Sequence, residues 1–179
     1  MNYIDSSYRS PLGPILLAAD ETGLTGLWFS DKSRYYAEGL RADAEERELP
    51  VFKRTKEWLD VYFSGQEPGF LPPLHLTGPA FRRRVGEIML EIPYGQTTTY
   101  GEIARRIARE RGIDRMSAQA VGGAVGHNPI SILVPCHRVV GTNGSLTGYG
   151  GGIERKIALL KLEGADFSSL FVPKKGTAL

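Results

Sequence analysis

The sequence is poor in cysteine and histidine, with one cysteine, Cys136, and three histidines in 179 residues. A single cysteine cannot close an internal disulfide, so nothing indicates an oxidising compartment. So few sulfur and imidazole ligands also argue against a structural zinc site. We therefore predict a protein without metal or cofactor.

Long hydrophobic runs are missing as well. No apolar segment approaches the roughly 20 residues that a membrane helix needs. The first residues, Met1 to Asp5, lack the basic start and apolar block of a secretory signal. We expect a cytoplasmic protein that does not enter a membrane.

Charge is divided unevenly along the chain, although the formal net charge is only +2. Residues 1–79 hold 8 Lys/Arg against 12 Asp/Glu, a net of −4, whereas residues 80–164 hold 12 against 7, a net of +5. This asymmetry fits a basic C-terminal module that faces a polyanion, and it fits a solvated helical surface equally well.

The N-terminal part predicts β-structure followed by a helix. Apolar runs at 14–19 and 24–29 are typical of strands, and acidic, helix-favouring sequence follows. Residues 51–63 place their apolar side chains on one helical face. Residues 66–79 contain four prolines and two glycines, which predicts a linker between domains.

The second part predicts three helices. An apolar stripe runs over 81–92, and the Thr99-x-x-Glu102 spacing of a capping box opens a second helix that ends near Gly112. Ser117 can cap a third, 118–126. Two short helices joined by a Gly-containing turn are typical of a helix-turn-helix, which also occurs in proteins that bind no DNA.

The third predicted helix has little side-chain bulk. Two glycines inside a helix each cost up to about 1 kcal/mol relative to alanine, so something must approach its backbone closely. Close packing against another helix would explain this, and so would entry into a nucleic-acid groove. The small residues are Ala118, Ala120, Gly122, Gly123 and Ala124.

Cys136 is the candidate nucleophile. It follows the apolar run Ile132-Leu133-Val134, which predicts a buried strand, and it is flanked by Pro135 and by His137-Arg138. A lone cysteine is usually a small buried hydrophobe, but nearby positive charge favours a reactive thiolate. A disulfide oxidoreductase would need a second cysteine. A cysteine hydrolase is disfavoured because adjacent residues on an extended segment point to opposite faces.

A wider pattern surrounds Cys136. Pro135-Cys136-His137-Arg138-Val139 is preceded by Gly122-Gly123-Ala124 and Asn128-Pro129, and it is followed by Gly148-Tyr149 and by residues 159–164. Over residues 80–164 the chain resembles the O6-alkylguanine-DNA alkyltransferase family. Segments 10–14 and 23–28 resemble the smaller domain of that family.

The resemblance implies an N-terminal α/β domain like ribonuclease H (1–65), a linker (66–79), a mainly α DNA-binding and alkyl-acceptor domain (80–164) and a C-terminal tail (165–179). The second domain would carry a winged-helix-like helix-turn-helix that enters the minor groove. It implies a monomer that acts on double-stranded DNA, flips out the damaged base and moves an alkyl group from O6 of guanine, or from O4 of thymine, to Cys136 in a single turnover.

The resemblance also implies roles for individual residues. His137 would relay the thiol proton through water, Glu163 would orient His137, and Tyr100 would help to rotate the base. Asn128 would brace the turn before the active site. The remaining residues predicted to contact DNA or the base are Ala118, Gln119, Gly122, Gly123, Arg138, Val139, Tyr149 and Gly150.

Two positions depart from the family pattern. Gln119 stands where the family usually carries an arginine that fills the gap left by the flipped base, and Gly150 stands where serine is frequent. The alternative is an alkyltransferase-like protein that binds lesions without chemistry, but such proteins lack the acceptor cysteine. A transcriptional regulator in this family would need a further cysteine-rich domain.

Overall fold

The computed structural model describes residues 1–31 and 33–174, and the chain divides into two compact units. Met1–Thr77 and Pro129–Leu133 form the first unit. Gly78–Asn128 and the described residues from Val134 onward form the second. None of the described helices combines the length and the apolar composition that a membrane span requires.

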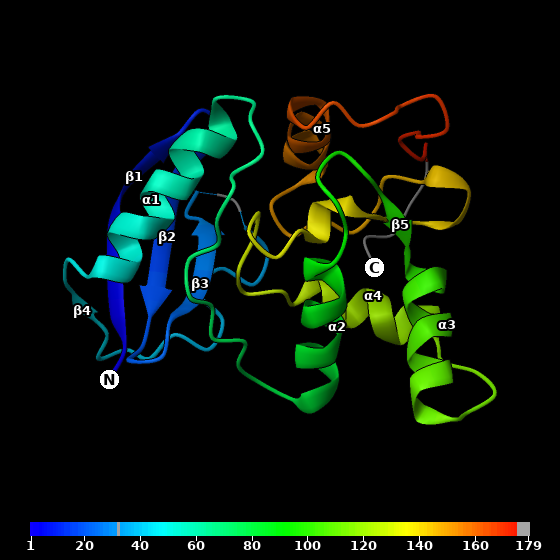
Figure 1. The fold of residues 1–179 in the computed structure, drawn as a ribbon, viewed down its shortest axis with the longest axis horizontal. Helices are drawn as coiled ribbons and strands as arrows, with labels where there is room; N and C mark the ends of the chain where they lie inside the picture. The colour runs from blue at the N-terminus through cyan, green and yellow to red at the C-terminus, as the bar shows by residue number, and fades with distance from the viewer. Residues whose placement is uncertain (32, 175–179) are drawn as a thin grey trace. The chain divides into compact units, whose positions relative to one another are not determined.

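The first unit contains a four-stranded sheet in the order β3-β2-β1-β4 (Figure 1). Neighbours among β1 to β3 are antiparallel, and the short β4 runs parallel to β1. Helix α1 packs against β1 and β2, and its Phe52 and Leu59 are fully buried. The elements are β1 Tyr3–Ser10, β2 Gly13–Ala19, β3 Leu24–Phe29, β4 Glu45–Glu46 and α1 Pro50–Phe63.

The strands predicted at 14–19 and 24–29 and the helix at 51–63 are confirmed. β2 can be a continuous apolar run because both of its faces are covered. Leu16 and Ala18 pack with Trp28 under Ala37 and Leu40, whereas α1 packs against the sheet as well. The helix-favouring segment after residue 30 is not helical: described residues 33–44 form turns without a helix.

The second unit is built from helices and two short parallel strands (Figure 1). The three predicted helices are confirmed, with Thr99 and Glu102 forming the capping box and Ser117 accepting a hydrogen bond from Ala120 N. Six residues, 112–117, join the two helices of the helix-turn-helix. The elements are α2 Ala80–Leu90, β5 Thr98–Thr99, α3 Tyr100–Arg111, α4 Ala118–Gly126, the 3₁₀ turn η1 Cys136–Arg138, β6 Val139–Val140, η2 Thr142–Gly144 and α5 Ile153–Leu162.

The predicted tail, 165–179, begins with an ordered segment. Phe167 and Leu170 pack against the buried cluster of Val140, Leu146 and Leu160. Phe171 pairs with the loop after β6, because its N–H donates to Gly144 O at 3.1 Å and its carbonyl accepts from Leu146 N at 2.8 Å. The rest of this tail beyond residue 174 lies outside the described residues.

Candidate active site

Cys136 lies at the start of a 3₁₀ turn rather than at the end of a strand. The predicted strand at 132–134 is wrong: Ile132 has a φ of 69°, and Leu133 N donates to Ser131 O at 2.8 Å in a tight turn. A left-handed residue interrupts extended backbone, even in an apolar, β-branched run. The alternation expected of a strand therefore does not separate Cys136 from His137.

The Cys136 thiol is buried, with 7% of the residue exposed. Burial raises the pKa of the thiol, whereas a hydrogen bond from the Asn128 side chain and the charge of Lys156 oppose that rise. Asn128 also donates from Nδ2 to Val134 O at 2.8 Å, so one side chain joins the end of α4 to the segment before η1. Asn128 thus has both the bracing position that we predicted and a direct influence on the thiol.

His137 and Glu163 form a buried pair. His137 Nε2 donates to Glu163 Oε1 at 2.6 Å, and neither side chain is exposed to solvent. Burial lowers the pKa of His137 in spite of the neighbouring carboxylate, so the imidazole is neutral and can accept a proton. Because Nε2 faces Glu163, Nδ1 is the nitrogen that can receive the thiol proton.

Arg138 binds the same carboxylate from the other side. Its Nε donates to Glu163 Oε2 at 2.9 Å and its Nη2 to Oε1 at 3.0 Å, while Nη1 donates to Ile92 O at 2.6 Å. Gly95 N adds a bond to Oε2 at 3.1 Å. Burial alone would raise the pKa of Glu163, but its hydrogen bonds with His137 and Arg138 and the positive charge of Arg138 hold it at about 2. Glu163 is therefore ionised, and Arg138 keeps it in place; contact of Arg138 with DNA stays a prediction.

Lys156 is a functional candidate that the sequence interpretation missed. Its side chain is fully buried, and Nζ donates to Val139 O at 2.5 Å and to Thr147 O at 2.7 Å. Burial lowers the pKa of Lys156 to about 8, against the opposing charge of Cys136. Lys156 lies on the buried face of α5 with Leu159 and Leu160, and Glu163 is the C-cap residue seven positions after Lys156. A charged residue on an apolar helical stripe is the signal that could have revealed it.

We expect Lys156→Met to slow alkylation of Cys136 while the variant still folds. Methionine fills similar space, but it removes the positive charge that lowers the pKa of the thiol. A rise of one pKa unit would reduce the thiolate fraction, and hence the rate near pH 7, about tenfold. The measurement is the pH dependence of the rate of alkylation by iodoacetamide, with the thermal unfolding curve recorded alongside.

Lys161→Met is the matched control for Lys156→Met, because Lys161 is an exposed cation on the same helix. Its pH profile should coincide with that of the unmodified protein. If the Lys156→Met profile coincides too, the buried ammonium does not influence the thiol.

Tyr100 and Tyr149 line the same region as the thiol. Tyr100 begins α3, is 4% exposed, and donates its hydroxyl to Thr147 O at 3.1 Å. Burial and the Cys136 charge raise the pKa of Tyr100 to about 12, so it is a hydrogen-bond donor at neutral pH. The Tyr149 ring meets the His137 ring edge-on, with centroids 6.5 Å apart. Gly150 follows Tyr149 in the partly exposed loop before α5.

The other predicted contact residues lie on α4. Ala118 and Gln119 are exposed in its first turn, and Gly122 is buried. A Cβ added at Gly123 would meet nothing within 4 Å, so packing inside the protein does not explain that glycine. The backbone of α4 is therefore open to an external partner at Gly123. Among the described residues, no group of three or more His, Cys, Asp and Glu side chains could hold a metal.

The chain matches two family descriptions. Residues 4–76 match "6-O-methylguanine DNA methyltransferase, ribonuclease-like domain", and residues 80–165 match "6-O-methylguanine DNA methyltransferase, DNA binding domain". The protein is 44% identical over 158 residues to a methylated-DNA–protein-cysteine methyltransferase of Methanosarcina acetivorans, covering 88% of this chain and 96% of that protein. It is 41% identical over 157 residues to the Haemophilus influenzae protein of the same name, covering 87% and 83% of the two chains.

Solved structures give the same result. The O6-methylguanine methyltransferase of Mycobacterium tuberculosis superposes with a TM-score of 0.75 at 42% identity, over 91% of this chain and 93% of that one. The Mycobacterium tuberculosis OGT in complex with DNA superposes with a TM-score of 0.74 at 41% identity, over 90% and 92% of the two chains. Both similarities span the N-terminal and the C-terminal units.

Proposed function

The chain belongs to the 6-O-methylguanine DNA methyltransferase family, and we propose that it repairs DNA by moving a methyl group from O6 of guanine to Cys136. The observation that carries this proposal is the buried Cys136 thiol directly before the hydrogen-bonded pair of His137 and Glu163. It combines a nucleophile, a base and a group that orients the base.

The transfer itself is a displacement at carbon. The Cys136 thiol gives its proton to His137 through a water molecule, and Glu163 stabilises the imidazolium that forms. The sulfur attacks the methyl carbon, a C–S bond forms, and the C–O6 bond breaks with its electron pair on guanine. Guanine leaves after taking up a proton, and the thioether remains on the protein. Because nothing regenerates the thiol, each molecule acts once.

The base must leave the helix for this reaction, since a stacked guanine cannot present its O6-methyl group to a buried thiol. We interpret α3 and α4 as the helix-turn-helix of a winged-helix-like domain that places α4 in the minor groove. That groove is only about 6 Å wide, which suits a helix with an open backbone at Gly123. The flipped guanine would then lie against Tyr149.

Groups around the pocket would recognise the flipped base. The Val139 carbonyl, held by Lys156, can accept from the guanine amino group. The Tyr100 hydroxyl, which donates to Thr147 O in the free protein, would turn away from that carbonyl to donate to guanine N3. The Gly150 N–H can donate to O6, because that contact uses only the backbone. Transfer from O4 of thymine, action as a monomer and a cytoplasmic location complete the proposal.

A titration tests the proposed function. Increasing amounts of duplex containing O6-methylguanine are added to a fixed amount of protein, and the restored guanine is measured by nucleoside chromatography. The repaired amount should reach a plateau at one lesion per protein molecule. Repair that continues beyond this plateau would show a true turnover and exclude Cys136 as the final acceptor.

The protein should bind DNA more weakly with Gln119 than with an arginine at this position, because glutamine can hydrogen-bond the orphaned cytosine but supplies no charge. We expect Gln119→Arg to bind duplex more tightly, with a salt dependence of log K against log[salt] that is steeper by about 0.9 if the new charge neutralises one phosphate. Fluorescence anisotropy between 50 and 200 mM salt measures both quantities. Gln119→Lys tests whether charge alone is sufficient, and an unchanged affinity and slope for Gln119→Arg would contradict the expectation.

A further inference from the structure

A cavity of about 400 Å³ lies where the outer face of α3 meets the start of α4. Its apolar lining includes Ala104 and Ala108 of α3, and it reaches Ala118, the first residue of α4. Three arginines also line it: Arg105, Arg109 and Arg115. The single carboxylate in the lining is that of Asp114, so the charges of the cavity sum to +2.

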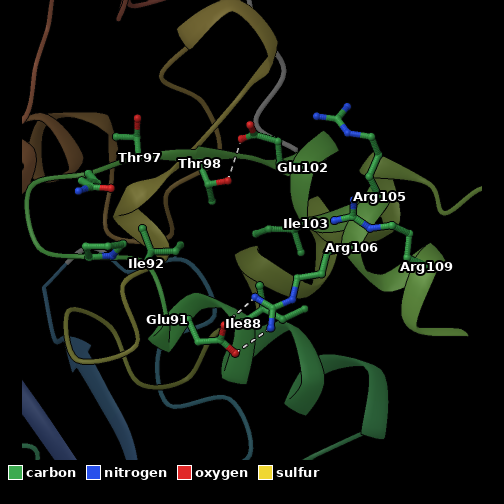
Figure 2. Close-up of a pocket in the computed structure, with 12 residues that line it drawn as sticks. Ile88, Glu91, Ile92, Thr97, Thr98, Glu102, Ile103, Arg105, Arg106 and Arg109 are labelled. Atoms are coloured by element: carbon green, nitrogen blue, oxygen red, sulfur yellow. Dashed lines mark hydrogen bonds and ion pairs between the residues drawn. The ribbon is translucent and has the colours of Figure 1, made fainter.

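These arginines differ from the neighbouring Arg106 in their pairing. Arg106 binds Glu91 at 2.7 Å and Glu110 at 3.1 Å, and so it ties α3 to the end of α2. Figure 2 shows Arg106 turned toward Glu91. Arg105 and Arg109 also line a second cavity, whose volume is about 470 Å³. Arg105 and Arg109 line both cavities and therefore stand on the ridge between them.

No carboxylate forms an ion pair with the three cavity arginines in the part of the chain that the structure describes. Arg105 is near enough to Glu102 to help lower the pKa of that carboxyl, but three arginines face one carboxylate in the lining of the cavity, and such excess positive charge raises the local concentration of anions. The positive end of the α4 macrodipole lies at the same place and has the same sign. The surface around this cavity is therefore electropositive and suits a negatively charged partner.

The turn between α3 and α4 contributes to this surface. It has six residues, 112–117, whereas three or four residues usually join the helices of a helix-turn-helix. The longer turn brings Arg115 and the 44% exposed Ile113 into the lining of the cavity.

We propose that Arg105, Arg109 and Arg115 bind the phosphodiester backbone of a DNA strand that crosses this cavity beside α4. The inference rests on the proposed function, which brings the first turn of α4 to DNA. Arg105 and Arg109 are one helical turn apart, a rise of about 6 Å, and B-DNA carries a phosphate every 3.4 Å along each strand, so the two guanidinium groups can reach different phosphates of one strand. Three such contacts would compensate for the charge that Gln119 does not supply.

The test is the salt dependence of DNA binding by the full chain with Arg105, Arg109 and Arg115 all replaced by alanine. The slope of log K against log[salt] should become shallower by about 0.9 for each phosphate that the variant no longer neutralises. The affinity should fall by the same factor for undamaged duplex and for duplex with O6-methylguanine, because phosphate contacts carry no sequence information. Replacing the same three residues by lysine should retain most of the slope.

The matched control removes three exposed cations from the first unit, Arg9, Arg47 and Lys53, for the same change in net charge. If its slope falls as much as that of the cavity variant, only the total charge matters and the proposal is overturned. A cavity variant with the wild-type slope also overturns it, and would leave an acidic protein segment as the ligand to test. In either case the unmodified protein still transfers its methyl group if the proposed function is right, so the two failures can be distinguished.

Discussion

Replacing Cys136 by alanine is expected to abolish methyl transfer completely while DNA binding stays within a few-fold of the unmodified protein. Cys136 carries the only thiol in the sequence, and its loss removes the atom that forms the new bond. Ala118 and Gln119, which are predicted to contact DNA, are by contrast exposed on α4 and keep their surroundings. Release of O6-methyl groups from the duplex and anisotropy with the same duplex measure the two effects.

The free energy of unfolding of Cys136→Ala must be measured as well, so that a loss of transfer can be distinguished from a loss of folding. Cys136 is buried but small, so alanine should lower the free energy of unfolding by only about 1 kcal/mol. A second variant, Cys136→Ser, keeps a hydrogen-bonding group but offers a far weaker nucleophile, and it should be equally inactive. Transfer at the normal rate by a folded Cys136→Ala protein would show that another group accepts the methyl.

Glu163→Gln should affect both stability and rate. The change leaves the charge of Arg138 buried without its carboxylate, which is expected to lower the free energy of unfolding by about 3 kcal/mol. Without the negative charge, the imidazolium of His137 is no longer stabilised, so the transfer rate should fall about 10²-fold or more. Urea unfolding and single-turnover repair at saturating protein are the measurements.

The pKa of Glu163 determines the direction in which the stability effect of Glu163→Gln changes with pH. The pKa of Glu163 is held at about 2 in the folded protein, below the ordinary value of 4.5. The stability that it contributes is therefore fully present above pH 4.5 and is lost as the pH falls toward 2. The difference between the two proteins should shrink over that range. Glu154→Gln removes an exposed carboxylate in the first turn of α5; it is the control and should change stability by less than about 0.5 kcal/mol.

Local signals in the sequence were sufficient for the helices of the second unit. The capping box of Thr99 and Glu102, the cap at Ser117 and the αL residue Gly112 all act within one turn of the backbone. Such short-range hydrogen bonds do not depend on the rest of the fold. The apolar runs at 14–19 and 24–29 also predicted strands, although the hydrogen bonds of those strands join them to their neighbours in the sheet.

The segment before Cys136 could not be predicted in this way. Its apolar, β-branched residues are buried as a strand would be, but Ile130 pairs with Leu27 of the first unit and Ile132 then turns with a positive φ. Leu27 and Ile130 are 103 residues apart in sequence, so their pairing leaves no signal in the local sequence.

The charged groups of the site show the same contrast between features that the sequence indicates and features that depend on distant segments. The resemblance placed Cys136, His137, Glu163 and Asn128 together, and the structure does bring these four side chains together.

Lys156 was missed, and Arg138 was assigned only to DNA, because a buried cation depends on partners from distant segments. For Lys156 these are the carbonyls of Val139 and Thr147, and for Arg138 they include the carboxylate of Glu163.

The most direct test of the account follows the methyl group itself. The unmodified protein is incubated with an equimolar duplex that contains O6-methylguanine. Its intact mass is then measured by mass spectrometry, and the protein is cleaved into peptides to locate the methyl group. We predict a gain of one methyl group per protein molecule, confined to the peptide that contains Cys136. A methyl on any other residue, or loss of methyl from the DNA with no gain on the protein, would contradict the account.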